Sequence, residues 1–172
     1  MNDALKLPRI QRKPLEVIIS PLYDSKSYYR GKPHLEDHVL DIVDAIAEGR
    51  PLPKWAYRSG IDDNYPPDTV LSRYGIMHLH LGKKSSSELL FLMQFDDHVV
   101  VLAIGNHNRF AEDPPGSLLY NFHRAKVEEI NRVRDEERLE ALAAAALAEA
   151  ARLEAKMENI QKGLLPRRQR LP

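Results

Sequence analysis

The feature that most constrains the fold is a stretch near the C-terminus, residues 117–162, that contains neither proline nor glycine. Alanine, leucine, glutamate and arginine dominate this stretch, and all four have high helix propensity. At 1.5 Å per residue, a helix of this length would reach roughly 65 Å, whereas a domain of about 110 residues has a radius of gyration of only about 13 Å. We therefore predict a domain over residues 1–112, followed by a region over residues 113–172 that holds one long α-helix and a basic, disordered end.

The long helix carries part of a coiled-coil pattern. Apolar residues recur every seven positions: Leu139, Ala146, Leu153 and Ile160. The second core position of such a pattern is weakened by Glu149 and Lys156. We predict that the helix associates with another chain, either a second copy or a protein inhibitor. The alternative is a solvated single helix stabilised by Glu/Arg pairs.

The region before the helix predicts an α+β domain. A short β-branched run over residues 15–20 predicts a strand. Apolar residues at helical spacing predict a helix over residues 35–48, which Gly49 would end. Three more strands are expected: residues 74–81, 88–95 and 98–105. Their short links indicate a meander, so we expect a small antiparallel sheet packed by one or two helices.

Composition limits the classes of function. The chain has 25 basic and 25 acidic residues, so it is not a uniformly basic nucleic-acid binder. It has no cysteine, which excludes disulfides, thiolate metal sites and cysteine nucleophiles. No apolar run approaches the roughly 20 residues that span a bilayer, and the N-terminus lacks a signal-peptide pattern. We therefore expect a cytoplasmic protein with no membrane partner.

Histidines supply the candidate chemistry. His78 and His80 are two residues apart on a predicted strand, so their side chains should leave the same face of the sheet, together with Tyr74. His107 follows the last predicted strand, in a loop position where functional residues often lie. We predict that these three histidines are catalytic and that His78 and His107 approach each other.

Two imidazoles near one another suit RNA cleavage. One can deprotonate a ribose 2′-hydroxyl while the other protonates the leaving oxygen, because the pKa of histidine lies near neutrality. Flanking cations would stabilise charge on the phosphate, and the candidates for substrate binding are Arg73, Lys83, Lys84 and Arg109. This chemistry requires no metal or other cofactor.

Two other groups of residues have side chains that can bind metal ions. His34 and His38 are four residues apart at a helix start and could pair as ligands with His78 or His80, but a solvated helix end explains them better. The prolines and acidic residues of positions 51–69, including Asp68, predict a solvated loop, because they lack the spacing of a calcium site.

The three-strand region resembles a known family. The segments are Tyr74-Gly-Ile-Met-His78-Leu, then residues 89–96, then Val99 to Phe110. In the last segment, Gly-Asn-His stands at the end of the predicted strand and a phenylalanine, Phe110, follows it. They are similar to the C-terminal half of RelE/ParE-superfamily toxins, in particular the YafQ-like branch. The resemblance implies a ribosome-dependent mRNA endonuclease held in check by an antitoxin. By position it carries catalytic roles to His78 and His107 and a substrate-binding role to Phe110.

A second function stays open. The family usually has an acidic residue and often a tryptophan soon after the strand histidine, where this chain has Leu81, Gly82 and lysines. The balanced charge is also unlike a basic nuclease. Both features favour a non-catalytic binding module of the same fold that acts through protein–protein interaction.

Overall fold

The computed structural model describes residues 3–57, 68–83, 86–110 and 112–164, with the side chains of Arg109, Phe110 and Leu164 left out of the description. By contact, the chain divides into two units, Met1–Ile130 and Asn131–Pro172, which are described separately below. Several sequence-based predictions fall outside the described residues: Lys84, most of the loop that contains Asp62 and Asp63, and the basic C-terminal end.

The first unit is built around a four-stranded sheet in the order β1-β4-β3-β2. The strands are β1 (Glu16–Ile19), β2 (Ile76–His80), β3 (Leu89–Gln94) and β4 (His98–Gly105). The last three form an antiparallel meander, as the short links predicted. β3 and β4 are almost wholly buried, which agrees with their apolar sequences and their central positions.

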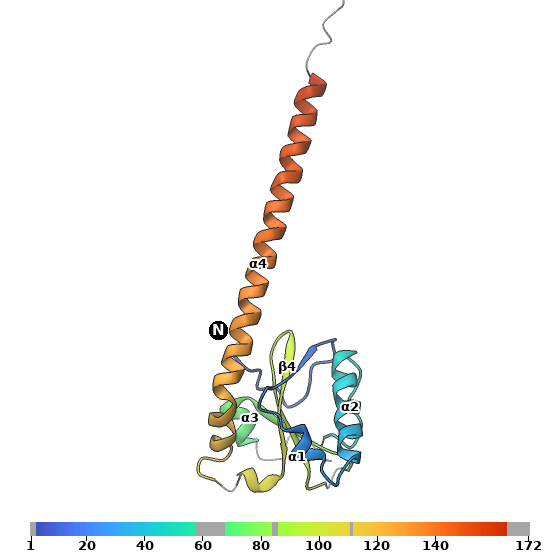
Figure 1. The fold of residues 1–172 in the computed structure, drawn as a ribbon, viewed down its shortest axis with the longest axis vertical. Helices are drawn as coiled ribbons and strands as arrows, with labels where there is room; N and C mark the ends of the chain where they lie inside the picture. Colours follow the sequence, from blue (N-terminus) through green and yellow to red (C-terminus); the bar gives the residue numbers. More distant parts are fainter. Residues whose placement is uncertain (1–2, 58–67, 84–85, 111, 165–172) are drawn as a thin grey trace, which may run out of the picture. The chain divides into compact units, whose positions relative to one another are not determined.

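One face of the sheet is covered by α2 (His34–Ala47) (Figure 1). Its apolar stripe buries Val39, Ile42 and Ile46 against strand residues such as Leu79 and Leu90. Gly49 follows the helix with a φ of +68°, a left-handed conformation that favours glycine. The predicted helix, its buried face and its glycine terminator are therefore confirmed.

The other face is covered by α3 (Thr69–Tyr74) and the first turns of α4 (Ser117–Leu164) (Figure 1). Leu119 and Val127 of α4 are buried in a second apolar cluster together with Phe91 of β3. The rings of Tyr74 and Tyr120 stack with centroids 4.7 Å apart, which joins α3 to α4. The sheet of this unit is thus a central layer between two helical layers.

A short helix, α1 (Ser25–Tyr29), fills part of the polar segment after β1. Asp24 caps it by accepting a hydrogen bond from the backbone N–H of Ser27 at 3.1 Å. The hydroxyls of Tyr23 and Tyr29 are hydrogen-bonded at 2.7 Å. Burial, and then this hydrogen bond, raise the pKa of Tyr23 well above its ordinary value.

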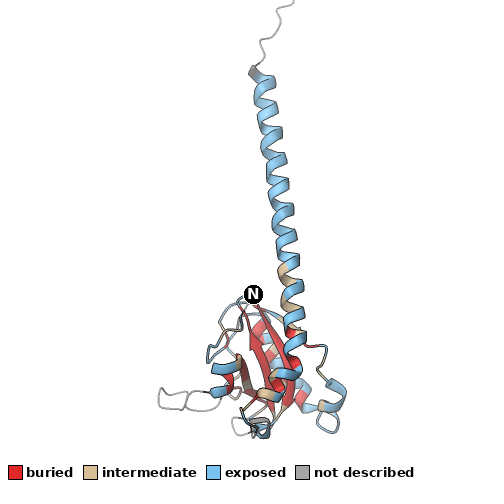
Figure 2. Ribbon diagram, turned by 90° about the vertical axis from the view of Figure 1, so that its left-hand side faces the viewer, coloured by how far each residue is buried: buried red, intermediate tan, exposed pale blue. Residues whose placement is uncertain are grey.

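The second unit consists of the remaining part of α4, residues 131–164. The predicted long helix is confirmed, and nearly all of its residues in this unit are exposed (Figure 2). Large apolar side chains are among them: Leu139, Leu142, Leu147, Leu153, Met157 and Ile160. This unit therefore carries large apolar side chains on the surface of its helix.

The α+β class is confirmed, but two details differ from the sequence-based expectation. β1 pairs with β4 in parallel, so the sheet is mixed rather than wholly antiparallel. Tyr74 was expected on a strand with His78, yet it ends α3, and Gly75 turns the chain with a φ of +69° before β2 begins at Ile76. The segment from Asp68, expected as loop, begins this helix.

Candidate functional site: a three-histidine cluster

Three histidines from two segments, strand β2 and the turn after β4, meet at one end of the sheet. The ring centroids of His78 and His107 lie 5.6 Å apart, those of His80 and His107 lie 5.7 Å apart, and those of His78 and His80 lie 6.2 Å apart. One ring nitrogen from each residue lies within 4.8 Å of the other two. The predicted approach of His78 to His107 is confirmed, and His80 joins them.

The strand register explains this convergence. His80 lies opposite Leu89 on β3, and Leu89 lies opposite Gly105 on β4. His107 begins a 3-10 helix, η1 (His107–Phe110), directly beyond that end of β4. The chain therefore brings His107 to the end of the sheet that already carries His78 and His80.

The alternation of β2 sets which side of the sheet the cluster occupies. Met77 and Leu79 belong to the apolar cluster beneath α2, whereas Ile76 belongs to the cluster beneath α3 and α4. Because side chains alternate along a strand, His78 and His80 point to the same side as Ile76. The candidate site thus lies on the side of the sheet away from α2.

His78 is held by Asp68. Oδ2 of Asp68 lies 3.1 Å from Nδ1 of His78, and both side chains are partly buried. The other carboxylate oxygen caps α3 by accepting from the backbone N–H groups of Val70 and Leu71 at 2.9 and 3.0 Å. Burial alone would raise the pKa of Asp68, but the contact with His78 and the backbone hydrogen bonds outweigh it and lower the pKa.

His80 is held by a backbone carbonyl. Its Nδ1 lies 3.1 Å from the carbonyl oxygen of Ser86, which can only accept a hydrogen bond, so Nδ1 must donate the proton. The side chain is only 3% exposed, whereas His107 is exposed. The three members therefore range from buried to solvent-accessible, with His107 on the outside.

This arrangement can support two kinds of chemistry. Imidazoles that are this close can pass a proton to and from one substrate. Three imidazole nitrogens within 4.8 Å of one another can also hold a metal ion, and in the described part of the chain no other group of three histidines or carboxylates has this spacing. Sequence reasoning identified the three histidines but assigned Asp68 to loop solvation and did not single out Ser86.

The predicted substrate-binding cations are placed less fully. Arg73 lies exposed in the last turn of α3, just before β2, and Lys83 lies exposed just after it. The side chains of Arg109 and Phe110 are not among those described, and Lys84 lies outside the described residues. Their roles in substrate binding stay predictions.

The remaining histidines lie apart from the cluster. His34 and His38, considered above as metal ligands, have ring centroids 5.8 Å apart on α2, and the rings of His38 and Trp55 have centroids 5.2 Å apart.

His98 is fully buried; its ring stacks on that of Phe95, and its Nδ1 lies 2.6 Å from Oδ1 of Asp97. His123 is buried in α4, with its Nδ1 3.5 Å from Oγ of Ser20.

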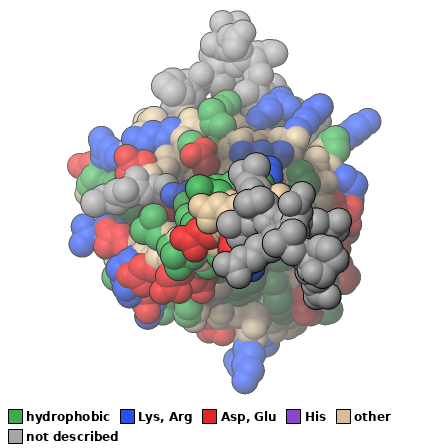
Figure 3. All heavy atoms as spheres, turned by 90° about the horizontal axis from the view of Figure 1, so that it is seen from above, with side chains coloured by type: hydrophobic (Ala, Val, Ile, Leu, Met, Phe, Trp, Pro, Cys, Tyr) green, Lys and Arg blue, Asp and Glu red, His purple; other side chains and the backbone are tan. Residues whose placement is uncertain are grey.

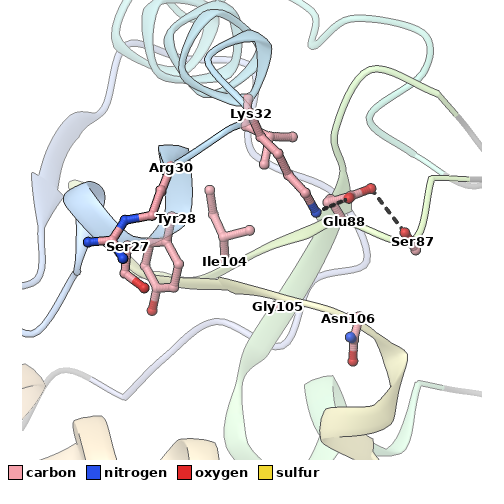
Figure 4. Close-up of a pocket in the computed structure, with 10 residues that line it drawn as sticks. Ser27, Tyr28, Arg30, Lys32, Ser87, Glu88, Ile104, Gly105 and Asn106 are labelled. Atoms are coloured by element: carbon pink, nitrogen blue, oxygen red, sulfur yellow. Dashed lines mark hydrogen bonds and ion pairs between the residues drawn. The ribbon is translucent and has the colours of Figure 1, made fainter.

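A polar pocket of about 310 Å³ lies at the same end of β4 and is lined by Gly105 and Asn106, the two residues before His107 (Figure 4). Arg30 and Lys32 line it from the segment after α1.

Lys32 and Glu88 of this pocket form an ion pair, in which Nζ of Lys32 donates a hydrogen bond to the Glu88 carboxylate at 2.8 Å. This hydrogen bond, and then those from the hydroxyls of Ser86 and Ser87, lower the pKa of Glu88 to about 2.

Known proteins do not identify the site. No protein family, curated protein or solved structure matches this chain. None of the helices in the described segments combines the length and the apolar character needed to cross a membrane. Figure 3 shows basic and acidic side chains interspersed on the face it draws, in keeping with the balanced charge of the sequence.

Proposed function

We propose that the three-histidine cluster is the active site of an endoribonuclease, and that the protein acts as the toxin of a toxin–antitoxin pair in the cytoplasm. The observation that carries this proposal is the convergence of His78, His80 and His107, with ring centroids 5.6 to 6.2 Å apart. The resemblance of the strand region to RelE/ParE-superfamily toxins supplies the substrate class, mRNA on the ribosome, and the cognate antitoxin as partner.

The contacts of each histidine suggest its role. The carboxylate of Asp68 beside Nδ1 of His78 keeps a proton on that nitrogen, so Nε2 can accept the proton of a ribose 2′-hydroxyl. The 2′-oxygen then attacks the adjacent phosphorus and forms a 2′,3′-cyclic phosphate. The exposed His107, as imidazolium, gives its proton to the departing 5′-oxygen. His80 is nearly inaccessible, so it acts by positioning the other two.

Flanking cations would complete the site. Arg73 and Lys83 bracket β2. Positive charge at these positions would stabilise the phosphorane-like transition state and hold the RNA backbone. We propose that Lys84, Arg109 and Phe110 contribute in the same way.

Induced expression tests this function. Expression of the wild-type chain should arrest growth and produce cleaved mRNA with 2′,3′-cyclic phosphate ends. His78→Ala and His107→Ala should each reduce cleavage at least roughly 100-fold. His34→Ala is the matched control, because His34 is an exposed histidine of α2 outside the cluster. Cleavage that survives His107→Ala would refute the proposal.

A second candidate function is a non-catalytic toxin of the same fold that acts by binding a protein target. The balance of 25 basic and 25 acidic residues favours it, because RNA binding is driven by cation–phosphate contacts. Growth arrest that persists in both His78→Ala and His107→Ala, without cleaved mRNA, would select this alternative.

We further propose that residues 131–164 of α4 associate with another chain, either a second copy or the antitoxin. Leu153, Met157 and Ile160 are spaced as i, i+4 and i+7, so they share one side of the helix, and each is more than half exposed. A single solvated helix with ion pairs such as Arg132–Glu136 and Lys162–Glu158 is the alternative.

A further inference from the structure

The histidine cluster has the features of a metal centre as well as those of an acid–base site. We propose that His78, His80 and His107 bind one divalent transition-metal ion, with Zn²⁺ as the ion that fits best. This inference rests on the geometry of the cluster and stands whether or not the protein cleaves RNA.

The spacing of the nitrogens is the first argument. Three atoms that lie within 4.8 Å of one another surround a point that is at most about 2.8 Å from each, whereas a Zn–N bond is about 2.0–2.1 Å long. A shift of each nitrogen by under about 1 Å, which side-chain torsions can supply, would bring all three to bonding distance. His107 is exposed and therefore the member best able to move.

The orientation of the rings is the second argument. Histidines that bind metals almost always donate their other N–H to a carboxylate, a carbonyl or water. His78 has Asp68 at 3.1 Å from Nδ1, and His80 has the carbonyl of Ser86 at 3.1 Å from Nδ1. The hydrogen bond to Ser86 places the proton of His80 on Nδ1, and the nearby carboxylate favours the same proton position on His78. In this form Nε2 of each ring carries the lone pair that would bind the ion.

The chemistry of the ligand set selects the ion. Three neutral imidazoles suit Zn²⁺, Cu²⁺, Ni²⁺ or Fe²⁺ and suit the hard cations Mg²⁺ and Ca²⁺ poorly. Zn²⁺ accepts three histidines readily and leaves a fourth tetrahedral position open. That position would face solvent on the side of His107, because His80 closes the opposite side.

Metal binding would change the proposed reaction. Coordination uses the lone pairs of Nε2, so an ion on the cluster would prevent His78 from acting as a general base. If the proposed function holds, added Zn²⁺ should inhibit RNA cleavage and a chelator should restore it. This consequence alone depends on the proposed function.

The test uses the full-length protein after chelator treatment and dialysis. Zn²⁺ titrated by calorimetry should bind with one equivalent per chain, and Co²⁺ as a spectroscopic substitute should give the visible absorption of a tetrahedral site. His107→Ala should weaken Zn²⁺ binding at least roughly 10-fold and abolish the Co²⁺ band. His107 is exposed, so this variant should keep the wild-type circular dichroism spectrum.

His80→Ala is the second variant and should have the same effect if it folds. His34→Gln is the control, which tests the His34–His38 pair on α2. It should bind Zn²⁺ as the wild type does, because His34 is not one of the three proposed ligands. The proposal is overturned if the wild type shows no saturable Zn²⁺ binding, if folded His107→Ala binds unchanged, or if His34→Gln loses as much affinity as His107→Ala.

Discussion

The carboxylate of Asp68 links helix α3 to the histidine cluster. Oδ2 lies 3.1 Å from Nδ1 of His78. Oδ1 accepts hydrogen bonds from two backbone N–H groups in the first turn of the helix, those of Val70 and Leu71. One side chain therefore stabilises the helix that leads into β2 and sets the proton position on the first histidine of that strand.

Asp68→Asn should separate these two roles. The amide oxygen can keep the helix cap, because Asn and Asp cap equally well, but the amide NH₂ would face Nδ1 of His78 and favour a proton on Nε2. We expect Zn²⁺ affinity to fall roughly 10- to 100-fold, RNA cleavage to fall with it, and the free energy of unfolding to change by under about 0.5 kcal/mol.

Calorimetry with Zn²⁺ and urea denaturation check this prediction. Asp68→Ala is the comparison, because it removes the cap as well and should cost about 1 kcal/mol of stability. Wild-type Zn²⁺ affinity in Asp68→Asn would show that the carboxylate does not position His78.

The Lys32–Glu88 pair predicts a pH dependence. Hydrogen bonds from Lys32, and then from Ser86 and Ser87, lower the pKa of Glu88 from an ordinary 4.5 to about 2. A lowered carboxyl pKa means that its stabilisation is present above about pH 4.5 and is lost as the pH falls toward about 2. NMR titration of the Glu88 carboxyl carbon should show this low pKa.

Lys32→Gln should raise the pKa of Glu88 toward its ordinary value, because the first cause of the shift is removed. Lys83→Gln, at another exposed lysine, is the control and should leave the Glu88 titration unchanged. An unaltered pKa in Lys32→Gln would show that the ion pair does not form in solution.

Gly49 predicts a strong effect on stability. A Cβ added there would lie 2.6 Å from the carbonyl carbon of Lys13 and 2.6 Å from the nitrogen of Pro14. The φ of Gly49 is +68°, in the left-handed region. Gly49→Ala should therefore lower the free energy of unfolding by at least about 1–2 kcal/mol, the cost of a left-handed conformation alone. Urea denaturation followed by tryptophan fluorescence of Trp55 measures it.

Gly163→Ala is the matched control for that experiment. Gly163 lies in α4, and apart from its chain neighbours and the nearby helix backbone, no described atom lies within 4 Å of a Cβ added there. Alanine should raise the helical signal of α4 slightly, since glycine is about 1 kcal/mol less favourable in a helix, and should leave the urea midpoint of the sheet unit unchanged. Equal effects of the two substitutions would contradict the steric account of Gly49.

The exposed apolar side of α4 predicts association. Sedimentation of the full chain should show a species larger than a monomer, or a complex with a co-expressed neighbouring protein. Leu153→Lys combined with Ile160→Lys should abolish either one, because both side chains are more than half exposed in the chain alone.

Substitution tests this better than truncation at Gly116, which would also remove the buried Leu119 and Val127 from the sheet unit. A wild-type chain that stays monomeric at high concentration and binds no co-expressed neighbour would contradict the proposed association.

Strong local patterns made much of the fold predictable from sequence. The i, i+4, i+7 stripe of α2, the apolar runs of β3 and β4 and the absence of helix breakers in α4 each specify one structure without help from the rest of the chain. The parallel pairing of β1 with β4 was not predictable in this way, because it depends on where the chain returns after α1 and α2.

The histidines of the site were predictable, but the residues that orient two of them were missed. The period of two on a strand places His78 beside His80, and the short links of the meander bring His107 back to them. The prolines and acidic residues around Asp68 predict a solvated loop, although they also carry a cap signal: Asp68 precedes Val70 and Leu71, and Gly75 ends the short helix. The carbonyl of Ser86 carries no sequence signal, since every residue has one.

The central claim is that the three-histidine cluster is the functional centre of the protein, and cleavage of ribosome-bound mRNA by the purified full-length chain tests it most directly. Primer extension should show discrete cuts with the wild type and with His34→Ala, and at least roughly 100-fold fewer with His78→Ala or His107→Ala. Cuts of equal intensity with wild type and His107→Ala, or no cuts with any of these proteins, would contradict it.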